Sequence, residues 1–552
     1  MPEDPPPRRY WPVWIVIGCI AAGAAIGGVL WFRQSGREFS SERLVSLIET
    51  EFERLAGEHY SLAIDSMTVA VRQRVLVAHG ISIASKRDSA HTQVFDFDVD
   101  IPSVQLTDAG PLDMLRGRLP TSGSLTIEQP LLVVRSIPRT TEAGESGHVS
   151  WEDNLARTFH GLALDSLLIH DLTVVQSGMA PGLPDSISGI HLILKDTSID
   201  STRHPEERPL FFSEDAAVAV PRHHWISDSG TYSITAGPLA ASSTLQLAYL
   251  DTLAVQPVAP VETLDRMRGH RGGHYRIATG AVEARGVAFD HVLRHGNIYI
   301  ASIDVDGFDI DYLEDARPPP GPRRQKWQPQ RWAANLDRTF DIDTLRLSSG
   351  NVLYDRFSAD GTRSGSLAFR GMYATGYHLN NLGESVDDRP VSQLDVLFRL
   401  AGTGRLSLHF ELDLADPEFD MRYSGTFGPM DLQPLNDFLI PTEGLRIRRG
   451  YVENASFRIT VNNGIASGVF DSRYRDLNII EVNKASGRSR LKHRIRSFLL
   501  NQLRLKARNL ETDRGGPRQG TISHTYTEDE TFLHFLWFST RSGIFSITGL
   551  EN

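Results

Sequence analysis

Apolar and polar residues alternate with a period of two over most of the chain, which is the pattern of a β-strand with one buried face. The alternation is strict from Phe95 to Ile101 and recurs over several hundred residues. It predicts strands at 62–71, 75–83, 95–101, 124–134, 162–175, 187–194, 232–235, 245–249, 297–311, 340–354, 405–414 and 447–460. Because each such strand has one apolar face, the sequence predicts a mainly β fold class, built as a long, half-buried sheet.

Helical spacing of apolar residues occurs near the two ends of the chain. Residues 41–56 place Leu44, Ile48 and Phe52 on one face, which predicts an amphipathic helix that lies against a membrane or caps the body. Residues 486–503 repeat this spacing among basic side chains. A strand at 519–526 and a second apolar segment at 531–550 follow. That last segment contains Arg541 and Gly543, so we do not interpret it as a membrane span.

The N-terminal segment 11–32 has 22 consecutive uncharged residues. As a helix it would be about 33 Å long, which is enough to cross the hydrocarbon core of a bilayer. Trp11 and Trp14 mark one membrane interface, and Trp31 and Phe32 mark the other. Two arginines stand just before the segment and two just after it, so the positive-inside rule does not orient the helix. The short head and the long polar body predict a signal anchor with the body translocated.

Two alternatives remain open in this segment. Residues 16–19 loosely resemble a lipobox, which would make Cys19 a lipidated N-terminus after cleavage, but the apolar run continues well past Cys19. Gly23 and Gly27 form a G-x-x-x-G pair that would pack against a partner helix, or are simply small residues of a spanning helix.

Charge and composition narrow the function classes. The 57 basic and 68 acidic residues give a net charge of −11, which argues against a nucleic-acid-binding protein. With 40% hydrophobic and 23% charged residues, the chain is not a disordered polyelectrolyte. Cys19 is the only cysteine, which excludes an intramolecular disulfide, a Cys-rich zinc site and a CxxC redox motif.

The usual catalytic and metal-binding motifs do not occur in a supporting context, so we expect no enzyme, no cofactor and no metal. Four aspartates between Asp304 and Asp311 resemble a calcium loop, but apolar residues alternate with them. We therefore interpret them as the solvated face of a strand. His270 and His274 are four residues apart, but intervening glycines make a shared helix face, and hence a metal site, a weak hypothesis.

Two groups of residues near the C-terminus are candidates for lipid contact. The basic side chains of the segment 486–503 would touch anionic headgroups or, alternatively, be solvated on a helix that caps the end of the sheet. These side chains are Arg488, Arg490, Lys492, Arg494 and Arg496. Aromatic residues of the last apolar segment are candidates for a terminal apolar contact, namely Phe535, Trp537 and Phe538.

The order of these features resembles the bacterial AsmA-like family over most of the chain. The resemblance is carried by the anchor, by YSLAIDSMTVAV with VLVAHGISIAS, by VQLTDAGPLDMLRGRLPTSGSLTIEQPLLVVR, by FDIDTLRLSSGNVLYD and by YVENASFRITVNNGIASGVFDSRYRDLNI. It implies an inner-membrane anchor, a periplasmic body and a long, twisted, U-shaped sheet of antiparallel type with an apolar, groove-forming face. The family implies phospholipid handling in envelope biogenesis and supplies no catalytic residues.

We therefore expect a single-pass inner-membrane protein whose groove shields phospholipid acyl chains between the inner and outer membranes. The alternatives are a non-transporting scaffold or assembly factor for outer-membrane proteins, with an envelope protein as partner, and an envelope hydrolase. The expected organisation is a cytoplasmic head at 1–10, a transmembrane helix at 11–32, a juxtamembrane helix at 33–57, β-rich groove segments at 58–316 and 333–485 around a Pro/Arg-rich linker or loop at 317–332, and C-terminal amphipathic helices with one strand at 486–552.

Overall fold

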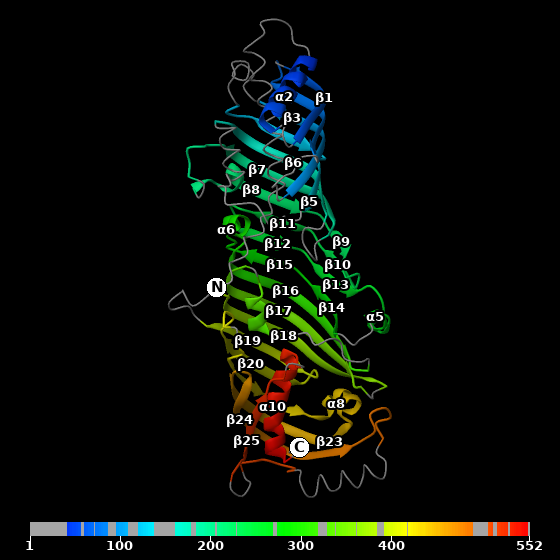
Figure 1. The fold of residues 1–552 in the computed structure, drawn as a ribbon. Coiled ribbons are helices and arrows are strands. Elements are labelled where there is room, and N and C mark those ends of the chain that lie inside the picture. The colour runs from blue at the N-terminus through cyan, green and yellow to red at the C-terminus, as the bar shows by residue number, and fades with distance from the viewer. Residues whose placement is uncertain are drawn as a thin grey trace, which may run out of the picture. The chain divides into compact units, whose positions relative to one another are not determined.

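The computed structural model describes residues 41–56, 60–70, 72–86, 95–108, 120–136, 161–177, 184–204, 207–227, 229–268, 273–317, 328–336, 338–359, 362–382, 391–416, 418–488, 506–511, 516–527 and 530–549. The 25 strands within these ranges belong to one mixed sheet, which confirms the predicted mainly β class (Figure 1). By internal contacts the chain divides into two units. Unit 1 takes the described residues up to 227 with 236–250 and 289–295, and unit 2 takes the rest.

Unit 1 follows the chain from strand to neighbouring strand. Its strands pair in the order β1, β2, β3, then β4 and β5 end to end along the same neighbours, then β6, β7, β8, β11 and β12. The short strand β9 follows β8 in the chain. Their bounds are β1 Tyr60–Ala70, β2 Val75–Ser85, β3 Phe95–Thr107, β4 Ser124–Glu128, β5 Leu131–Ser136, β6 Ala163–Ser177, β7 Ser186–Ser198, β8 Ser213–Val220, β9 His223–Ile226, β11 Leu239–Ser242 and β12 Leu247–Leu250. The short helices η2 (Leu210–Phe212) and α6 (Phe289–His295) complete the unit.

The apolar face of β1 to β8 is well buried. Residues such as Phe97, Ile127 and Leu194 are almost inaccessible to solvent and form one hydrophobic cluster. The helix α2 (Ser41–Ala56) has the bounds predicted from its amphipathic spacing and packs Ile48 into this cluster. Glu49 Oε1 accepts a 3.1 Å hydrogen bond from the backbone N–H of Ile64 on β1. The helix therefore caps the body, as one of the two predicted alternatives requires.

Unit 2 has the longer strands. They pair in the order β10, β13, β14 with β15, β16, β17, β18, β19, β20, β21 with β22, β23, β24, β25. Their bounds are β10 Tyr232–Ala236, β13 Leu253–Pro257, β14 Gly273–Thr279, β15 Val282–Arg285, β16 Ile298–Asp315, β17 Phe340–Phe357, β18 Ser364–Asn380, β19 Ser392–Leu400, β20 Gly404–Leu412, β21 Met421–Phe427, β22 Met430–Asp431, β23 Leu445–Asn462, β24 Ile465–Glu481 and β25 Gln519–Thr525.

Helices cover one end of the apolar face of unit 2. They are α7 (Pro329–Ala334), η3 (Gln433–Leu435), α8 (Asn436–Glu443) and α10 (Phe532–Thr548), while α5 (Val261–Arg268) follows β13 in the chain. The helix α10, drawn in red in Figure 1, lies on β24 and β25 and buries Phe535 and Ile547 in the second hydrophobic cluster. Gly543 and Gly520 allow this close approach, since a Cβ on Gly520 would lie 2.2 Å from the carbonyl oxygen of Gly543.

The serine side chains of α10 also hold the last strand. The backbone N–H groups of Thr521 and Ser523 on β25 donate to the hydroxyls of Ser546 and Ser542, at 3.1 and 3.0 Å. The helix begins after Thr531, whose hydroxyl accepts from the N–H of His534, and it ends at Gly549 in the left-handed conformation.

The sheet is mixed, which corrects the predicted antiparallel type. The parallel pairs between described strands include β4 with β6, β5 with β6, and β16 with β17. Parallel neighbours need a connection of a dozen or more residues, and the chain has such connections between β5 and β6 and, through the predicted linker, between β16 and β17. The stretch 317–332 therefore joins two adjacent strands of unit 2, and its last residues belong to α7.

Residues with positive φ keep the apolar face continuous through the long strands. The apolar positions of β16 change from odd to even numbers at Gly307 (φ 79°), and those of β17 change at Ser349 (φ 54°). Gly371 (φ 58°) stands at the matching irregularity of β18. A bulge of this kind inserts one residue and so returns the next apolar side chain to the same face. Three adjacent strands thus change phase together.

Among the described residues no helix is long and apolar enough to cross a bilayer. The predicted transmembrane helix at 11–32, the head before it and most of the predicted basic helix at 486–503 lie outside the described residues.

The positive φ angles of Gly307 and Ser349 predict opposite effects of substitution on stability. A Cβ at Gly307 would meet no atom within 4 Å, so Gly307→Ala should cost about 1 kcal/mol through left-handed strain alone. Ser349→Gly should relieve the same strain and leave the melting temperature equal or higher. Thermal unfolding followed by circular dichroism measures both, and a stabilising Gly307→Ala would contradict the role of the bulge.

Candidate functional site

The apolar face of unit 2 continues across its strands in register. One cross-strand row pairs Val282 with Val305, Val305 with Leu347, and Leu347 with Ala374. A second row pairs Ile277 with Ile310, Ile310 with Val352, and Val352 with Phe369. We call the side chains of β13 to β18 on this side the apolar strip; its central members are Ile303, Val305, Ile310, Leu345, Leu347 and Val352.

The apolar strip differs from the rest of the apolar surface in its burial. Its central side chains are only partly buried, and they belong to neither of the two hydrophobic clusters formed by described residues. By contrast, Phe410 and Ile459, further along the same face, are buried in the cluster beneath α10. A contiguous apolar surface that the chain itself leaves partly exposed is a feature of binding sites.

Polarity increases along the strip towards the ends of β16 and β17. Along β16 the face presents Ile310, then Tyr312, then Glu314, and along β17 it presents Val352, Tyr354 and Arg356. The parallel register pairs these residues one with one: Ile310 with Val352, Tyr312 with Tyr354, and Glu314 with Arg356. The two strands therefore change together from aliphatic to phenolic to charged.

The phenolic step is a row of stacked rings. The ring centroids of Tyr275 and Tyr312 are 4.9 Å apart, those of Tyr312 and Tyr354 are 5.7 Å apart, and Phe438 of α8 continues the row at 5.7 Å from Tyr354. Burial, together with the negative charge of Glu314, raises the pKa of both Tyr312 and Tyr354. Their hydroxyl groups therefore remain protonated hydrogen-bond donors.

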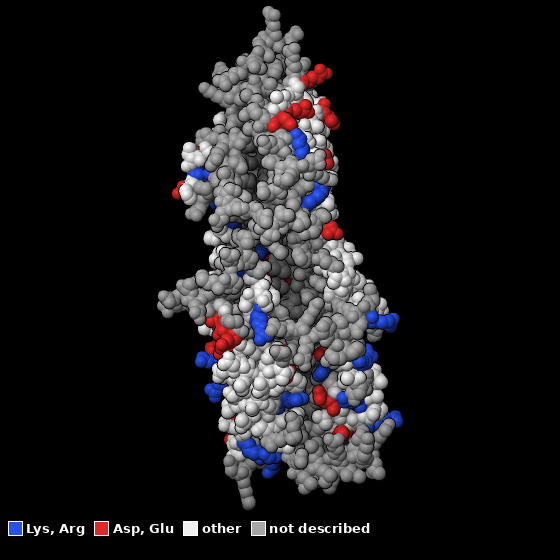
Figure 2. All heavy atoms as spheres, viewed as in Figure 1, with Lys and Arg blue, Asp and Glu red and all other residues white. Residues whose placement is uncertain are grey.

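Glu314 is the centre of the charged step. Its Oε2 accepts a 2.8 Å hydrogen bond from the hydroxyl of Tyr354 and lies 3.1 Å from His534 Nε2 of α10 and 3.8 Å from Arg356 Nε. Burial raises the pKa of Glu314, but the hydrogen bond and charge of His534, the Tyr354 hydroxyl and the Arg356 charge outweigh it and lower the pKa to about 2. In Figure 2, charged side chains of both signs lie in a hollow of the surface between α10 and α8.

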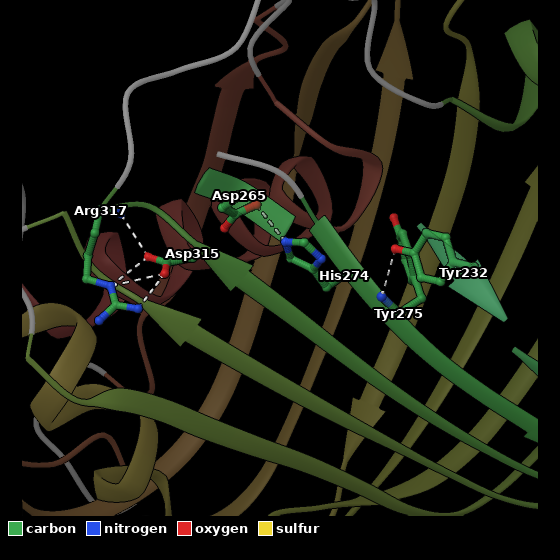
Figure 3. A network of polar contacts seen from close by, with 6 residues as sticks. All are labelled: Tyr232, Asp265, His274, Tyr275, Asp315 and Arg317. Atoms are coloured by element: carbon green, nitrogen blue, oxygen red, sulfur yellow. Dashed lines mark hydrogen bonds and ion pairs between the residues drawn. The ribbon is translucent and has the colours of Figure 1, made fainter. Parts of the chain in front are cut away.

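A second polar cluster lies where β14 begins and the antiparallel strand β16 ends, as Figure 3 shows. His274 Nε2 is 2.7 Å from Asp265 Oδ1 of α5, and both side chains are buried. Arg317 Nε donates to Asp315 Oδ1 at 2.8 Å, and its guanidinium lies 3.8 Å from the centre of the Phe357 ring. His274 is thus paired with a carboxylate, and no group of three or more metal-ligating side chains occurs among the described residues. His270 lies outside those residues.

The aspartates of β16 lie on the polar face, where β17 supplies a partner for three of them. Asp304 pairs with Arg346 at 3.3 Å, Asp306 accepts from Ser348 at 3.2 Å, and Asp309 accepts from Asn351 at 2.9 Å. This arrangement agrees with their interpretation as a polar strand face.

The residues predicted to contact lipid fall into three groups. Trp11, Trp14, Trp31 and Phe32, and Arg490, Lys492, Arg494 and Arg496, lie outside the described residues. Arg488 is described and exposed. Their contacts with lipid stay predictions.

The three aromatic residues of α10 differ from one another. Phe535 is fully buried against Phe419, with ring centroids 4.9 Å apart, so it serves the internal core. Trp537 is 42% exposed. Phe538 is partly buried, and the Arg541 guanidinium lies 4.7 Å from the centre of its ring. Of these three aromatic side chains, Trp537 is therefore the one with a largely free apolar surface; Leu533, on the same helix, is 64% exposed.

Sequence reasoning missed the polar end of the strip. A signal was present, because both strands carry the same spacing of aliphatic, tyrosine and charged residues: Ile310, Tyr312 and Glu314, then Val352, Tyr354 and Arg356.

No protein-family model matches this chain, and no curated protein is significantly similar to it. The arrangement of its own residues is therefore the basis for a functional proposal.

The low pKa of Glu314 predicts a pH-dependent contribution to stability. Its folded pKa of about 2 lies below its ordinary value of 4.5, so the contribution is full above pH 4.5 and is lost as the pH falls towards 2. Glu314→Gln should lower the free energy of unfolding by about 2 kcal/mol at pH 7 and by much less at pH 2.5.

Urea unfolding at both pH values measures this difference. Glu453→Gln is a matched control on β23, because Glu453 is 43% exposed and pairs with Arg475 at 3.6 Å on the surface. A Glu314→Gln penalty of equal size at pH 7 and pH 2.5 would show that the charge of Glu314 does not matter.

Proposed function

We propose that this protein shields phospholipid acyl chains on the apolar strip of unit 2, as a single-pass inner-membrane protein of the AsmA-like kind acting in envelope biogenesis. The proposal places 11–32 in the membrane and the β-rich body in the periplasm, with the strip as part of a U-shaped groove. It assigns no catalytic residue and no cofactor.

The observation that carries the proposal is the change of polarity along β16 and β17. A phospholipid has the same order of chemistry, with aliphatic chains, then ester groups that accept hydrogen bonds, then a charged headgroup. The aliphatic side chains of the strip match the chains, the phenol groups of Tyr312 and Tyr354 form an amphipathic step of intermediate polarity, and Glu314 with Arg356 supplies charge.

The dimensions agree with this match. Strands rise about 3.3 Å per residue, so the seven steps from Ile303 to Ile310, like those from Leu345 to Val352, span about 23 Å. One leaflet contributes about half of a hydrocarbon core of about 30 Å. The strip is therefore long enough to cover one acyl chain along a strand.

Partial burial supports a ligand that comes and goes. Each central side chain of the strip keeps some exposed apolar area, and covering such area contributes roughly 25 cal/mol for every Å² removed from water. Acyl chains adapt to an irregular apolar surface without needing directional partners, and the middle of the strip offers none.

Site-specific photocrosslinking tests the proposal. With p-benzoylphenylalanine at Val305 or Leu347 in the full chain in cells, we expect crosslinks to phospholipid, detected by mass spectrometry. The same probe at Asp306 or Thr375, on the polar face of the same sheet, should give none. Equal labelling from both faces, or none from either, would overturn the proposal.

Charge substitutions give a second, independent measurement. Val305→Asp and Leu347→Asp should each reduce the phospholipid that copurifies with the full chain at least fivefold, because a carboxylate in the strip would lose hydration beneath a bound chain. Thr375→Asp is the matched control on the polar face and should leave the lipid content unchanged. Circular dichroism of all three variants separates lipid loss from unfolding.

A scaffold or assembly function is the second candidate, because an aromatic pair is exposed on the polar face. Tyr373 and Tyr377 on β18 are 51% and 39% exposed and stand on the side opposite to the apolar strip. Exposed tyrosines of this kind are typical of protein interfaces. Crosslinking of one outer-membrane protein from Tyr377, with no phospholipid captured from Val305, would favour the scaffold.

A further inference from the structure

The polar face of unit 2 contains a cavity that the lipid proposal does not use. It is a depression open to solvent, with a volume of about 410 Å³, and lies over β20, β21, β23 and β24. Ser407 and His409 line it, and they alternate along β20 with Leu408 and Phe410, which face the opposite side. The cavity is therefore separated from the apolar face by the sheet itself.

Side-chain size explains why the sheet is hollowed there. Two cross-strand rows form the lining: His409 pairs with Ser424 and Ser424 with Arg458, while Thr426 pairs with Ser456. The middle strands β21 and β23 thus contribute small hydroxyl side chains. Longer side chains stand around them, including His409 on β20 and Asp471 on β24.

Apart from His409, the polar side chains of the cavity have no internal partners. Among the described residues, the hydroxyls of Ser407, Ser424, Thr426 and Ser456 make no hydrogen bond to another side chain or to the backbone, and Arg458 and Asp471 form no ion pair. The same polar face behaves differently at β16 and β17, where polar side chains bond across the strands, as Ser348 does to Asp306. The cavity therefore has hydrogen-bonding capacity that the fold does not use.

His409 stands at one wall of the cavity, with both ring nitrogens next to carboxylates. Its Nδ1 lies 2.8 Å from Asp395 Oδ1 and its Nε2 lies 3.4 Å from Glu411 Oε1, so both ring nitrogens are engaged outside the cavity. The hydrogen bond to Asp395 raises the pKa of His409, and Glu411 adds to this effect. The imidazole nitrogens are thus occupied, and among the described lining residues Arg458 is the cation free to donate.

We infer that this cavity binds an acidic sugar, a small polyhydroxylated molecule with one phosphate or carboxylate group. The guanidinium of Arg458 matches either anion through paired hydrogen bonds. Asp471 accepts from sugar hydroxyls, and Ser424, Thr426 and Ser456 donate to or accept from the remaining ones. A lone inorganic anion would leave Asp471 and most of the hydroxyls unused.

Binding to the full chain in detergent, followed by isothermal titration calorimetry, tests the inference. The probes are glucose 6-phosphate and glucuronate. The controls are glucose, which lacks the anionic group, and inorganic phosphate, which lacks the sugar. We expect saturable binding of at least one acidic sugar at millimolar concentration or below, at least tenfold tighter than glucose or phosphate alone. No saturable binding of either acidic sugar, or equal affinity for inorganic phosphate, would overturn the inference.

Variants locate the site. Arg458→Gln should weaken binding about tenfold or more, because it removes the charged donors. Arg399→Gln removes the same charge from the same polar face outside the cavity and should have no effect. Equal losses in the two variants would indicate attraction to the surface charge in general and contradict a built site.

A second pair of variants keeps the charge unchanged. Thr426→Val and Ser456→Ala remove hydroxyls only, and we expect each to weaken acidic-sugar binding while leaving phospholipid copurification intact. Unchanged sugar affinity in both variants, with the fold verified by circular dichroism, would show that the hydroxyls of Thr426 and Ser456 do not bind the sugar. The lipid readout is independent, so failure of either proposal leaves the other standing.

Discussion

Alternation of side chains across a pleated sheet is the constraint on which the rest of this structure depends. Successive residues of a strand point to opposite faces, so a single extra residue would move every following apolar side chain into water. In β16, β17 and β18 the apolar residues change between odd and even sequence positions. Their side chains still lie on one face because Gly307, Ser349 and Gly371 break the alternation at neighbouring positions of these three paired strands. Left-handed backbone conformation at single residues thereby keeps the apolar face of unit 2 continuous across neighbouring strands.

The apolar side of the strands is covered differently in unit 1 and in the two parts of unit 2. In unit 1 it is buried in a cluster to which α2 contributes Ile48, and towards the C-terminus α10 covers it with Phe535 and Ile547. Between β13 and β18 the described residues provide no such cluster. The same alternating pattern therefore produces a closed core in two places and a partly open strip in a third, and the difference lies in what covers the sheet.

The sequence was sufficient for the elements that keep a regular apolar pattern over enough consecutive residues. The helix α2 matches its predicted bounds of 41–56, and β16 and β17 fall where alternation placed them. Strands β18 and β24 are among those that were not predicted, as are β8, β19 and β21. Positive φ at His378 in β18 and at Asp476 in β24 shifts the apolar positions of these two strands between odd and even numbers, so neither alternates over its full length.

The candidate site could not be assembled from local pattern alone. Tyr354 and Glu314 are 40 residues apart and meet because β16 and β17 pair in parallel, and His534 reaches Tyr354 from 180 residues further along the chain. Alternation predicts that a strand exists, but it does not identify the neighbour, the direction or the register. Pairing across a long connection decides those three properties, and the polar end of the strip depends on all of them.

The serine contacts between α10 and β25 have a consequence for how the sheet meets other molecules. The free side of a terminal strand is normally a template for strand addition by another chain. At β25 the N–H groups of Thr521 and Ser523 are already occupied by Ser546 and Ser542. A partner that lengthened the sheet here would first have to displace a helix anchored by buried aromatic side chains. The C-terminal helix therefore fixes the number of strands on this side and directs partners to the faces of the sheet.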